Sequence, residues 1–415
     1  MTASFLIRPR RRLPLLCLIP AFCFIAIIAI WFGMNSDREY IHPVLTQLIP
    51  AGHCTCQSST IFQCSTCLTC YKHGPQEDTS STSWSFEYTR DGRNGALSQN
   101  QCKAAFPGLF EDIARGSKFW SSYGRLSSIE LDAITIQYGM ARAFIADGQL
   151  YVVKARPKSE DHRRKILGTL SSIHRALAAD QKRASRRHFE FVFSVEDRVD
   201  DITNSEWPIW VFSRTPTEEG VWLMPDFSFW AWDNPKNYIG PYDQVVQRIE
   251  RMDIPWSEKT PKLVWRGKPS FAPKLRRALI EAARDKSWGD IKQVDWDTGF
   301  NVLRMEDYCH YMFIAHVEGG FIFLLYRDTG ILLTIHYLGR SYSASLKYRQ
   351  ACNSVIIAHK LQFIQHHHYL LVADGPSQNY VEVERDFSDL SEKMETLVSN
   401  TEAAKRIANN SVMTF

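Results

Sequence analysis

The sequence has little net charge. Its 49 lysines and arginines are nearly balanced by 45 aspartates and glutamates, which leaves a formal net charge of +4 over 415 residues. Part of that excess comes from a short N-terminal run of arginines, so the rest of the chain is close to neutral. Without a strongly basic surface there is no electrostatic basis for binding nucleic acid, and we expect no such partner.

The sequence also has no evident internal repeat, and its composition is not that of a disordered chain. Hydrophobic residues make up 45% of the chain and charged residues 23%, which is typical of a folded protein. The length allows two or three domains, or one large enzyme with two lobes.

Charged residues are absent from 13–33, the long apolar run near the N-terminus. A helix of about 20 residues crosses the hydrocarbon core of a membrane, so this run predicts a transmembrane anchor. Arginines precede it, and Asp37 and Glu39 follow it. The positive-inside rule therefore places residues 1–12 in the cytosol and the body of the chain in the lumen. A cleaved signal peptide is the alternative, but its apolar core spans only about 7–15 residues and ends at a small-residue cleavage site, which this run lacks.

Eight of the ten cysteines follow the anchor, and five of them lie between positions 54 and 70. Spacing alone would suit zinc, whereas an oxidising lumen favours disulfide bonds, which we expect here. Five cysteines leave one over, and Cys102 is its expected partner, while the other pairings stay open. We interpret residues 34–105, which contain this cluster, as a luminal stem.

From about residue 106 the pattern becomes that of a folded domain. Asp147-Gly148 between two apolar runs predicts a β-hairpin over 142–155. Strands alternating with helices predict an α/β fold with mostly parallel sheets. A proline-rich stretch then divides an N-terminal lobe, 106–255, from a C-terminal lobe, 256–415. The other expected elements are helices at 159–179, 242–251, 274–286 and 389–410, strands at 189–195, 208–212 and 262–265, a strand or helix at 309–317, and a helix followed by a strand within 346–357.

Asp197 stands just beyond the apolar strand predicted at 189–195. Open α/β sheets bind ligands beyond the carboxyl ends of their strands. A carboxylate at that place is suited to act as general base toward an attacking hydroxyl group. Capping of the next turn is the structural alternative, and Glu196, Asp200 and Asp201 compete for the same role.

Two further segments are suited to bind an anion. The first, 265–270, places a glycine after a strand and before a helix that carries Arg276 and Arg277. Backbone N–H groups and guanidinium groups in such a layout can hold a diphosphate. In the second, 340–348, small hydroxylated residues lead into a helix. Surface arginines on a solvated helix and an ordinary N-cap are the structural alternatives.

Three consecutive histidines, His366, His367 and His368, resemble a metal site by composition. Consecutive side chains cannot all face one ion, so we expect no metal there.

Taken in this order, these segments resemble glycosyltransferase family 90, which includes fungal capsule-associated xylosyltransferase-like proteins and animal protein O-glucosyltransferases. The resemblance covers roughly residues 142–412. Its sharpest pieces are 147–152, 264–267, 343–355 and 378–390.

The resemblance implies a GT-B-like fold of two Rossmann-like lobes, with the donor held mainly by the C-terminal lobe. It implies inverting transfer from a UDP-sugar without an essential metal motif, so the UDP-sugar is a substrate and no cofactor is needed. It also implies that Asp197 deprotonates the acceptor. The implied donor-binding residues are Arg266, Gly267, Ser270, either Arg276 or Arg277, Ser343, Ser345 and Lys347.

The family usually has an arginine at the position of Ser345. Serine cannot replace the charge of a guanidinium group beside a diphosphate. We therefore expect donor affinity or turnover to be reduced in this chain.

The family also runs directly from a glutamate-glycine pair to an arginine-serine pair. Here the strongly apolar segment 320–339 separates Glu318-Gly319 from Arg340-Ser341. Arg327 and Asp328 interrupt this segment, which argues against a second transmembrane span. Our hypothesis is that this segment is an in-frame unspliced intron in the gene model. Reads of the mature transcript that cross this point test it, and consistent presence of the segment would contradict it. If the segment is present in the protein, we expect a broken donor site.

The function that the sequence favours is an inverting glycosyltransferase that moves xylose or glucose from a UDP-sugar to a hydroxyl group of a glycan, glycolipid or protein. It would be a single-pass type II protein of the Golgi or endoplasmic reticulum, held in the membrane through 13–33. The alternative is a non-catalytic, membrane-anchored relative of the same fold that serves as a binding or scaffold protein. Ser345 and the segment 320–339 favour this alternative, and Asp197 opposes it.

Overall fold

The computed structural model describes residues 84–92, 94–124, 126–180, 188–197, 207–232, 239–252, 254–320 and 340–415. The predicted cytosolic tail, anchor and cysteine cluster, the acids Asp200 and Asp201, and residues 321–339 lie outside these ranges. Among the helices within them, none is both long and apolar enough to cross a membrane.

The chain divides into two compact units, residues 1–83 with 87–96, and residues 84–86 with 97–415. The first unit contributes the short helix α4 (Tyr88–Asp91) to the described structure. The second unit contains two β-sheets and the helices that cover them.

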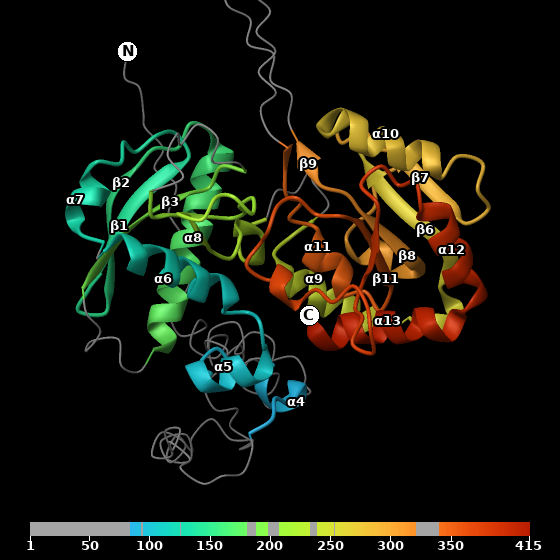
Figure 1. Cartoon of the computed structure of the whole chain (residues 1–415), viewed down its shortest axis with the longest axis horizontal. Helices are drawn as coiled ribbons and strands as arrows, with labels where there is room; N and C mark the ends of the chain where they lie inside the picture. Colours follow the sequence, from blue (N-terminus) through green and yellow to red (C-terminus); the bar gives the residue numbers. More distant parts are fainter. Residues whose placement is uncertain are drawn as a thin grey trace, which may run out of the picture. The chain divides into compact units, whose positions relative to one another are not determined.

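The first sheet is mixed and has the strand order β2-β1-β3-β4-β5, of which β2, β1 and β3 are labelled in Figure 1. β1 runs antiparallel to both β2 and β3, whereas β3, β4 and β5 run parallel to one another. The expectation of mostly parallel strands is therefore met only in part by this sheet. Its strands are β1 (Met140–Ala146), β2 (Gln149–Ala155), β3 (Phe189–Ser194), β4 (Ile209–Val211) and β5 (Trp222–Leu223).

The predicted hairpin is confirmed. Ala146 pairs with Gln149, and the two residues between them, Asp147 and Gly148, have φ angles of 50° and 72°. Positive φ at both central positions is the mark of a type I′ turn, whose twist matches that of the flanking strands. Asp and Gly adopt this backbone at low cost, which is why the dipeptide predicted the turn correctly.

Alternate residues of β3 enter two different cores. Phe191 and Phe193 pack with Ile166 of α8, whereas Val192 packs with Leu131 of α7. Successive strand residues point to opposite faces of a sheet, so α8 covers one face and α7 the other. The helices of this lobe are α5 (Gln99–Ala105), α6 (Glu111–Tyr123), α7 (Ser128–Asp132), α8 (Glu160–Ala179) and the 3-10 turn η3 (Phe227–Phe229).

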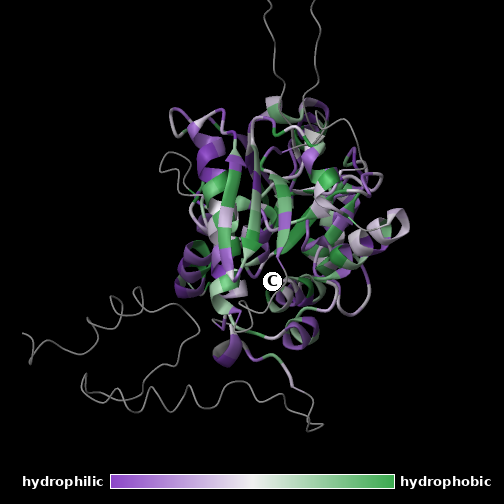
Figure 2. Ribbon diagram, turned by 90° about the vertical axis from the view of Figure 1, so that its left-hand side faces the viewer, coloured by the Kyte–Doolittle hydropathy of each residue, from purple (hydrophilic) through white to green (hydrophobic). Residues whose placement is uncertain are grey.

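The second sheet is entirely parallel and has the order β12-β11-β8-β6-β7. Leu263 and Trp265 of β6 pack against α10 (Pro273–Ala282) on one face, and Val264 packs against α9 (Tyr242–Met252) on the other. Burial on both faces explains the near-continuous apolar runs of the central strands. Figure 2, which views the molecule from the side of the first lobe, shows hydrophobic residues in green along the strands. The strands are β6 (Thr260–Gly267), β7 (Gly289–Gln293), β8 (Tyr311–His316), β11 (Val355–His359) and β12 (Val381–Val383).

Helices on both faces complete this lobe and give it an α/β architecture. They are α9 (Tyr242–Met252), α10 (Pro273–Ala282), α11 (Leu346–Gln350), α12 (Leu390–Ser399) and α13 (Thr401–Thr414), with 3-10 turns η5 (Trp256–Glu258), η6 (Pro269–Phe271), η7 (Glu306–His310) and η8 (His368–Leu370). α10 is shorter than the predicted helix at 274–286, because Asp285 takes a left-handed φ of 56°. Two sheets, one mixed and one parallel, with flanking helices are consistent with the expected pair of Rossmann-like lobes.

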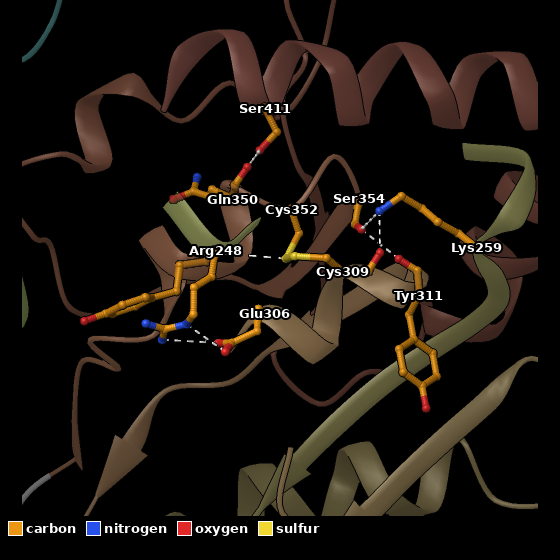
Figure 3. The surroundings of a disulfide bond; sticks show 10 residues. Arg248, Lys259, Glu306, Cys309, Tyr311, Gln350, Cys352, Ser354 and Ser411 are labelled. Atoms are coloured by element: carbon orange, nitrogen blue, oxygen red, sulfur yellow. Dashed lines mark hydrogen bonds and ion pairs between the residues drawn. A yellow bond between two sulfur atoms is a disulfide. The ribbon is translucent and has the colours of Figure 1, made fainter. Parts of the chain in front are cut away.

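A disulfide joins Cys309 and Cys352, and both residues are buried (Figure 3). It ties the turn before β8 to the chain between α11 and β11, 43 positions apart. Closing a loop of this length restricts the unfolded chain and typically stabilises the folded one by about 2–4 kcal/mol. Cys102, by contrast, is a free cysteine, so its predicted pairing with the N-terminal cluster does not form in this structure.

The two flanks of 321–339 lie side by side. β9 (Gly319–Gly320) and β10 (Arg340–Ser341) pair antiparallel, with Gly320 opposite Arg340. Opposite residues in such a ladder have Cα atoms about 4.5–5.5 Å apart, close to the roughly 3.8 Å between neighbours in a chain. The chain therefore leaves and re-enters the described fold at almost the same point.

We predict that a chain lacking residues 320–339 folds as well as the full chain. Joining Gly319 to Arg340 requires only a local adjustment of the β9–β10 ladder, and a shorter loop costs less entropy to close. Thermal unfolding followed by circular dichroism should give a midpoint no lower than that of the full chain. A Gly/Ser linker of equal length at 320–339 is the matched control for loop length. If the shortened chain aggregates or unfolds at a lower midpoint and the linker control does not, the segment belongs to the fold.

Candidate active site

The second sheet changes its winding direction beside β6. From β6 the chain passes through α10 to β7 at the sheet edge, whereas the next strand, β8, pairs with the opposite side of β6. Connections that depart in opposite directions from neighbouring parallel strands open a crevice at the carboxyl ends, where α/β sheets bind ligands. Those ends are Gly267 of β6 and His316 of β8, with the loops that follow them.

Arg276 of α10 bridges these two strand ends. Its Nη1 donates to the carbonyl of Lys268, just after β6, at 2.9 Å. Its Nη2 donates to the carbonyl of Glu318, just after β8, at 3.4 Å. The side chain is buried, and its guanidinium group lies near the rings of Trp265 and Phe271.

Arg276 is a buried cation with no carboxylate to neutralise it among the described residues. Its Nε has no hydrogen-bond partner there either. Burial, and after it the positive charge of Arg349, lower the pKa of Arg276 to about 10. A buried charge without a partner is costly, so this crevice is suited to receive an anion.

Arg277 and Ser270 are exposed, in contrast to Arg276. Together with Lys268 and Gln293 they line an open cavity of about 620 Å³ beside η6 and α10. The sequence left open which of the two arginines would hold a diphosphate. Burial and the missing counter-ion favour Arg276, while Arg277 and Ser270 are placed to contact other parts of a ligand.

Gly267 is required by the ring of Trp265. A Cβ atom at Gly267 would lie 2.4 Å from that ring, which is too close for any other residue without a shift.

Arg266, by contrast, is held by the neighbouring strand β7. Its Nη2 pairs with the carboxylate of Asp290 at 2.7 Å, and Tyr311 donates to the same carboxylate at 2.8 Å. Burial would raise the pKa of Asp290, but its hydrogen bonds, that to Arg266 foremost, lower it to about 2. Arg266 therefore has a structural partner.

Ser343 and Ser345 hydrogen-bond to each other through their hydroxyl groups, 2.9 Å apart, at the start of α11. Lys347 has a different partner: its Nζ pairs at 2.7 Å with Asp226, which follows β5 of the first lobe. Gln365 donates to the same carboxylate at 3.2 Å.

Lys347 and Asp226 are both fully buried, and their ion pair ties the two lobes together. Burial alone would raise the pKa of Asp226, but Lys347 and Ser228 hold it below its ordinary value. Lys347 is thus committed to a protein partner. Asp226 was not predicted, although its place just beyond a strand end, like that of Asp197, was an available signal.

Asp197 lies beyond the end of β3, and its side chain is 59% exposed. The Nζ of Lys165 in α8 lies 3.4 Å from its carboxylate and also pairs with Asp161 at 3.1 Å. Glu196 contacts His162 at 3.1 Å, and burial raises the pKa of its carboxyl group. Of these two neighbouring carboxylates, Asp197 is the more accessible to a ligand.

Tyr342 connects the two sets of predicted site residues. It belongs to the second-lobe segment 340–348 but packs in the core of the first lobe. Its pKa is raised by burial and, in addition, by the negative charges of Asp226 and Asp197. The fold therefore brings the segment around Ser345 toward the strand end that carries Asp197.

Of the three consecutive histidines, His367 is buried and the other two are half-buried. His367 has no hydrogen-bond partner for either ring nitrogen within the described residues. Across that same part of the chain, no group of three or more His, Cys, Asp or Glu side chains could hold a metal ion.

Comparison with protein families gives a match to the model of glycosyl transferase family 90 over residues 99–413. Comparison with curated proteins gives no match. The family match contains both sheets and every candidate site residue.

We predict that Lys347→Met destabilises the protein by about 3–5 kcal/mol, because it leaves the Asp226 carboxylate buried without its partner. The double variant Asp226→Asn/Lys347→Met removes both charges and should recover most of this loss. Urea unfolding of both variants measures the difference. Equal stability of the two variants would show that the pair does not couple the lobes.

We also predict that the free energy of unfolding falls as pH falls from about 6.5 to 4. Burial lowers the pKa of His359 and His366 to about 4 and that of His368 to about 3. The unfolded chain, in which histidine titrates near pH 6.5, then binds more protons than the folded one across this range, so acid favours unfolding. Urea midpoints at pH 7, 6 and 5 test this, and His366→Gln should reduce the slope. A midpoint independent of pH would contradict the prediction.

Proposed function

The chain belongs to glycosyltransferase family 90, and we propose that it transfers a sugar from a UDP-sugar to a hydroxyl group with inversion at the anomeric carbon. Membership in this family implies transferase activity. The observation that supports the donor is the buried, uncompensated Arg276 at the switch point of the parallel sheet.

A UDP-sugar fits this crevice because its leaving group is a diphosphate. As the bond between the anomeric carbon and the phosphate oxygen breaks, negative charge develops on UDP. A fixed guanidinium group in a site shielded from water stabilises that charge more strongly than water does. Arg276 is assigned this role, with Ser270, Arg277 and Ser343 contributing contacts to the donor.

Asp197 is assigned the role of base. The acceptor oxygen forms a bond to the anomeric carbon, and its proton passes to the Asp197 carboxylate. Its exposure on the first lobe leaves space for an acceptor, and the Nζ of Lys165 lies 3.4 Å from the carboxylate. The second lobe would then hold the donor and the first lobe the acceptor.

The donor sugar is proposed to be xylose, with glucose as the next candidate, and the acceptor a glycan, a glycolipid or a protein. The proposed place of action is the lumen of the Golgi or endoplasmic reticulum, with the chain anchored through 13–33. The buried Cys309–Cys352 disulfide supports an oxidising compartment.

A second candidate function is a non-catalytic relative that keeps the fold as a binding or scaffold protein. Ser345 favours it, because the residue lacks the charge that the family usually supplies there. Lys347 is paired with Asp226, so it supplies no positive charge to the donor site, and this also favours the non-catalytic function.

UDP release by the full chain, purified in detergent, across a panel of UDP-sugars separates the two functions. A transferase releases UDP from one donor, and Asp197→Asn should reduce that rate by about 100- to 10,000-fold, as expected for loss of a general base. Asp161→Asn is the matched control, because Asp161 also pairs with Lys165 but lies on α8. Release from no donor would contradict the proposal, and equal loss in both variants would reject Asp197 as the base.

A further inference from the structure

Arg349 lies one helical turn after Ser345. The N–H of Arg349 donates to the carbonyl of Ser345 at 3.3 Å, and α11 continues helically between them. Side chains four residues apart on a helix project from the same face. The chain therefore lacks a cation at Ser345 but carries one on the same face, one turn along.

The side chain of Arg349 reaches the same strand end as Arg276. Its Nη1 donates to the carbonyl of Ala315 at 2.8 Å and lies 3.4 Å from Nδ1 of His316. These are the last two residues of β8, and Arg276 contacts the carbonyl of Glu318 just beyond them. Both arginines thus line the carboxyl end of β8, at the crevice between β6 and β8.

Arg349 also has no carboxylate partner among the described residues. It is 5% exposed, its hydrogen bonds go to neutral groups, and its Nε has no partner there. The ring of Tyr308 lies 5.2 Å from its guanidinium carbon. Arg266 and Lys347, the other buried cations of this region, each pair with an aspartate.

Two buried like charges at one strand end repel each other, and an anion between them would relieve both the repulsion and the loss of hydration. The diphosphate of a nucleotide sugar carries enough negative charge to neutralise two guanidinium groups. Planar guanidinium groups also match phosphate oxygens in geometry.

We propose that Arg349 takes over the role of the arginine that is missing at Ser345 and that it binds the donor diphosphate together with Arg276. This inference rests on the proposed function, since it assigns a further residue to the same donor site. It also revises the expectation that Ser345 weakens donor binding, because the positive charge is moved by one helical turn and not lost.

Binding of UDP to the full chain, measured by titration calorimetry, tests the inference. Arg349→Ser should weaken UDP binding by roughly 10- to 100-fold, which corresponds to loss of one or two hydrogen bonds to a charged group. The double variant Ser345→Arg/Arg349→Ser returns a guanidinium group to the neighbouring turn and should recover most of the affinity. Arg304→Ser, which removes a charge from an exposed position, should bind UDP as the unaltered chain does.

Wild-type affinity in Arg349→Ser would overturn the inference. So would a loss that Ser345→Arg does not repair, because it would mark Arg349 as a structural residue. Thermal unfolding identifies any variant that fails to fold, and Arg349→Gln then replaces Arg349→Ser in the same comparison. If the unaltered chain binds no UDP, the proposed function fails with the inference. If it binds UDP and only Arg276→Ser loses affinity, the inference alone fails.

Discussion

The arrangement of the site depends on one buried ion pair between the lobes, Asp226 with Lys347. Neither side chain reaches water, so each requires the other, and the two lobes must approach closely enough to join them. The pair fixes the start of α11 against the first lobe. It thereby sets the position of Ser345 and Arg349 relative to the strand end that carries Asp197. This contact thus links the orientation of the proposed donor site to that of the proposed base.

The basic residues of this region fall into two kinds. Arg266 and Lys347 each have an aspartate within 2.7 Å and serve the fold. Arg276 and Arg349 are equally buried, but their hydrogen bonds go to neutral groups. A buried cation that the protein itself does not neutralise is costly to maintain. Its presence at the switch point of a parallel sheet is therefore a stronger sign of an anion site than the number of basic residues nearby.

Segment 320–339 interrupts this region in the sequence, but the described framework on both sides of it is intact. The β9–β10 ladder holds its flanks together, and the Cys309–Cys352 disulfide closes a larger loop around it. Residues on both sides keep their places: Glu318 accepts a hydrogen bond from Arg276, and Tyr342 packs in the first lobe. The described site is thus compatible with a chain that passes directly from Gly319 to Arg340, as in the family.

Local signals in the sequence determined the elements and the class of protein. Asp147-Gly148 specified its hairpin, apolar runs specified β3, β4, β6 and β8, and the order of short motifs indicated the family that the match over 99–413 shows. The boundaries of α10, the mixed pairing of the first sheet and the free thiol of Cys102 were not predicted, since each depends on contacts outside its own segment. The sequence alone also could not separate structural cations from candidate ligands. Counter-ions come from distant segments, as Asp290 does for Arg266 and Asp226 for Lys347, and only the tertiary structure decides which charges meet.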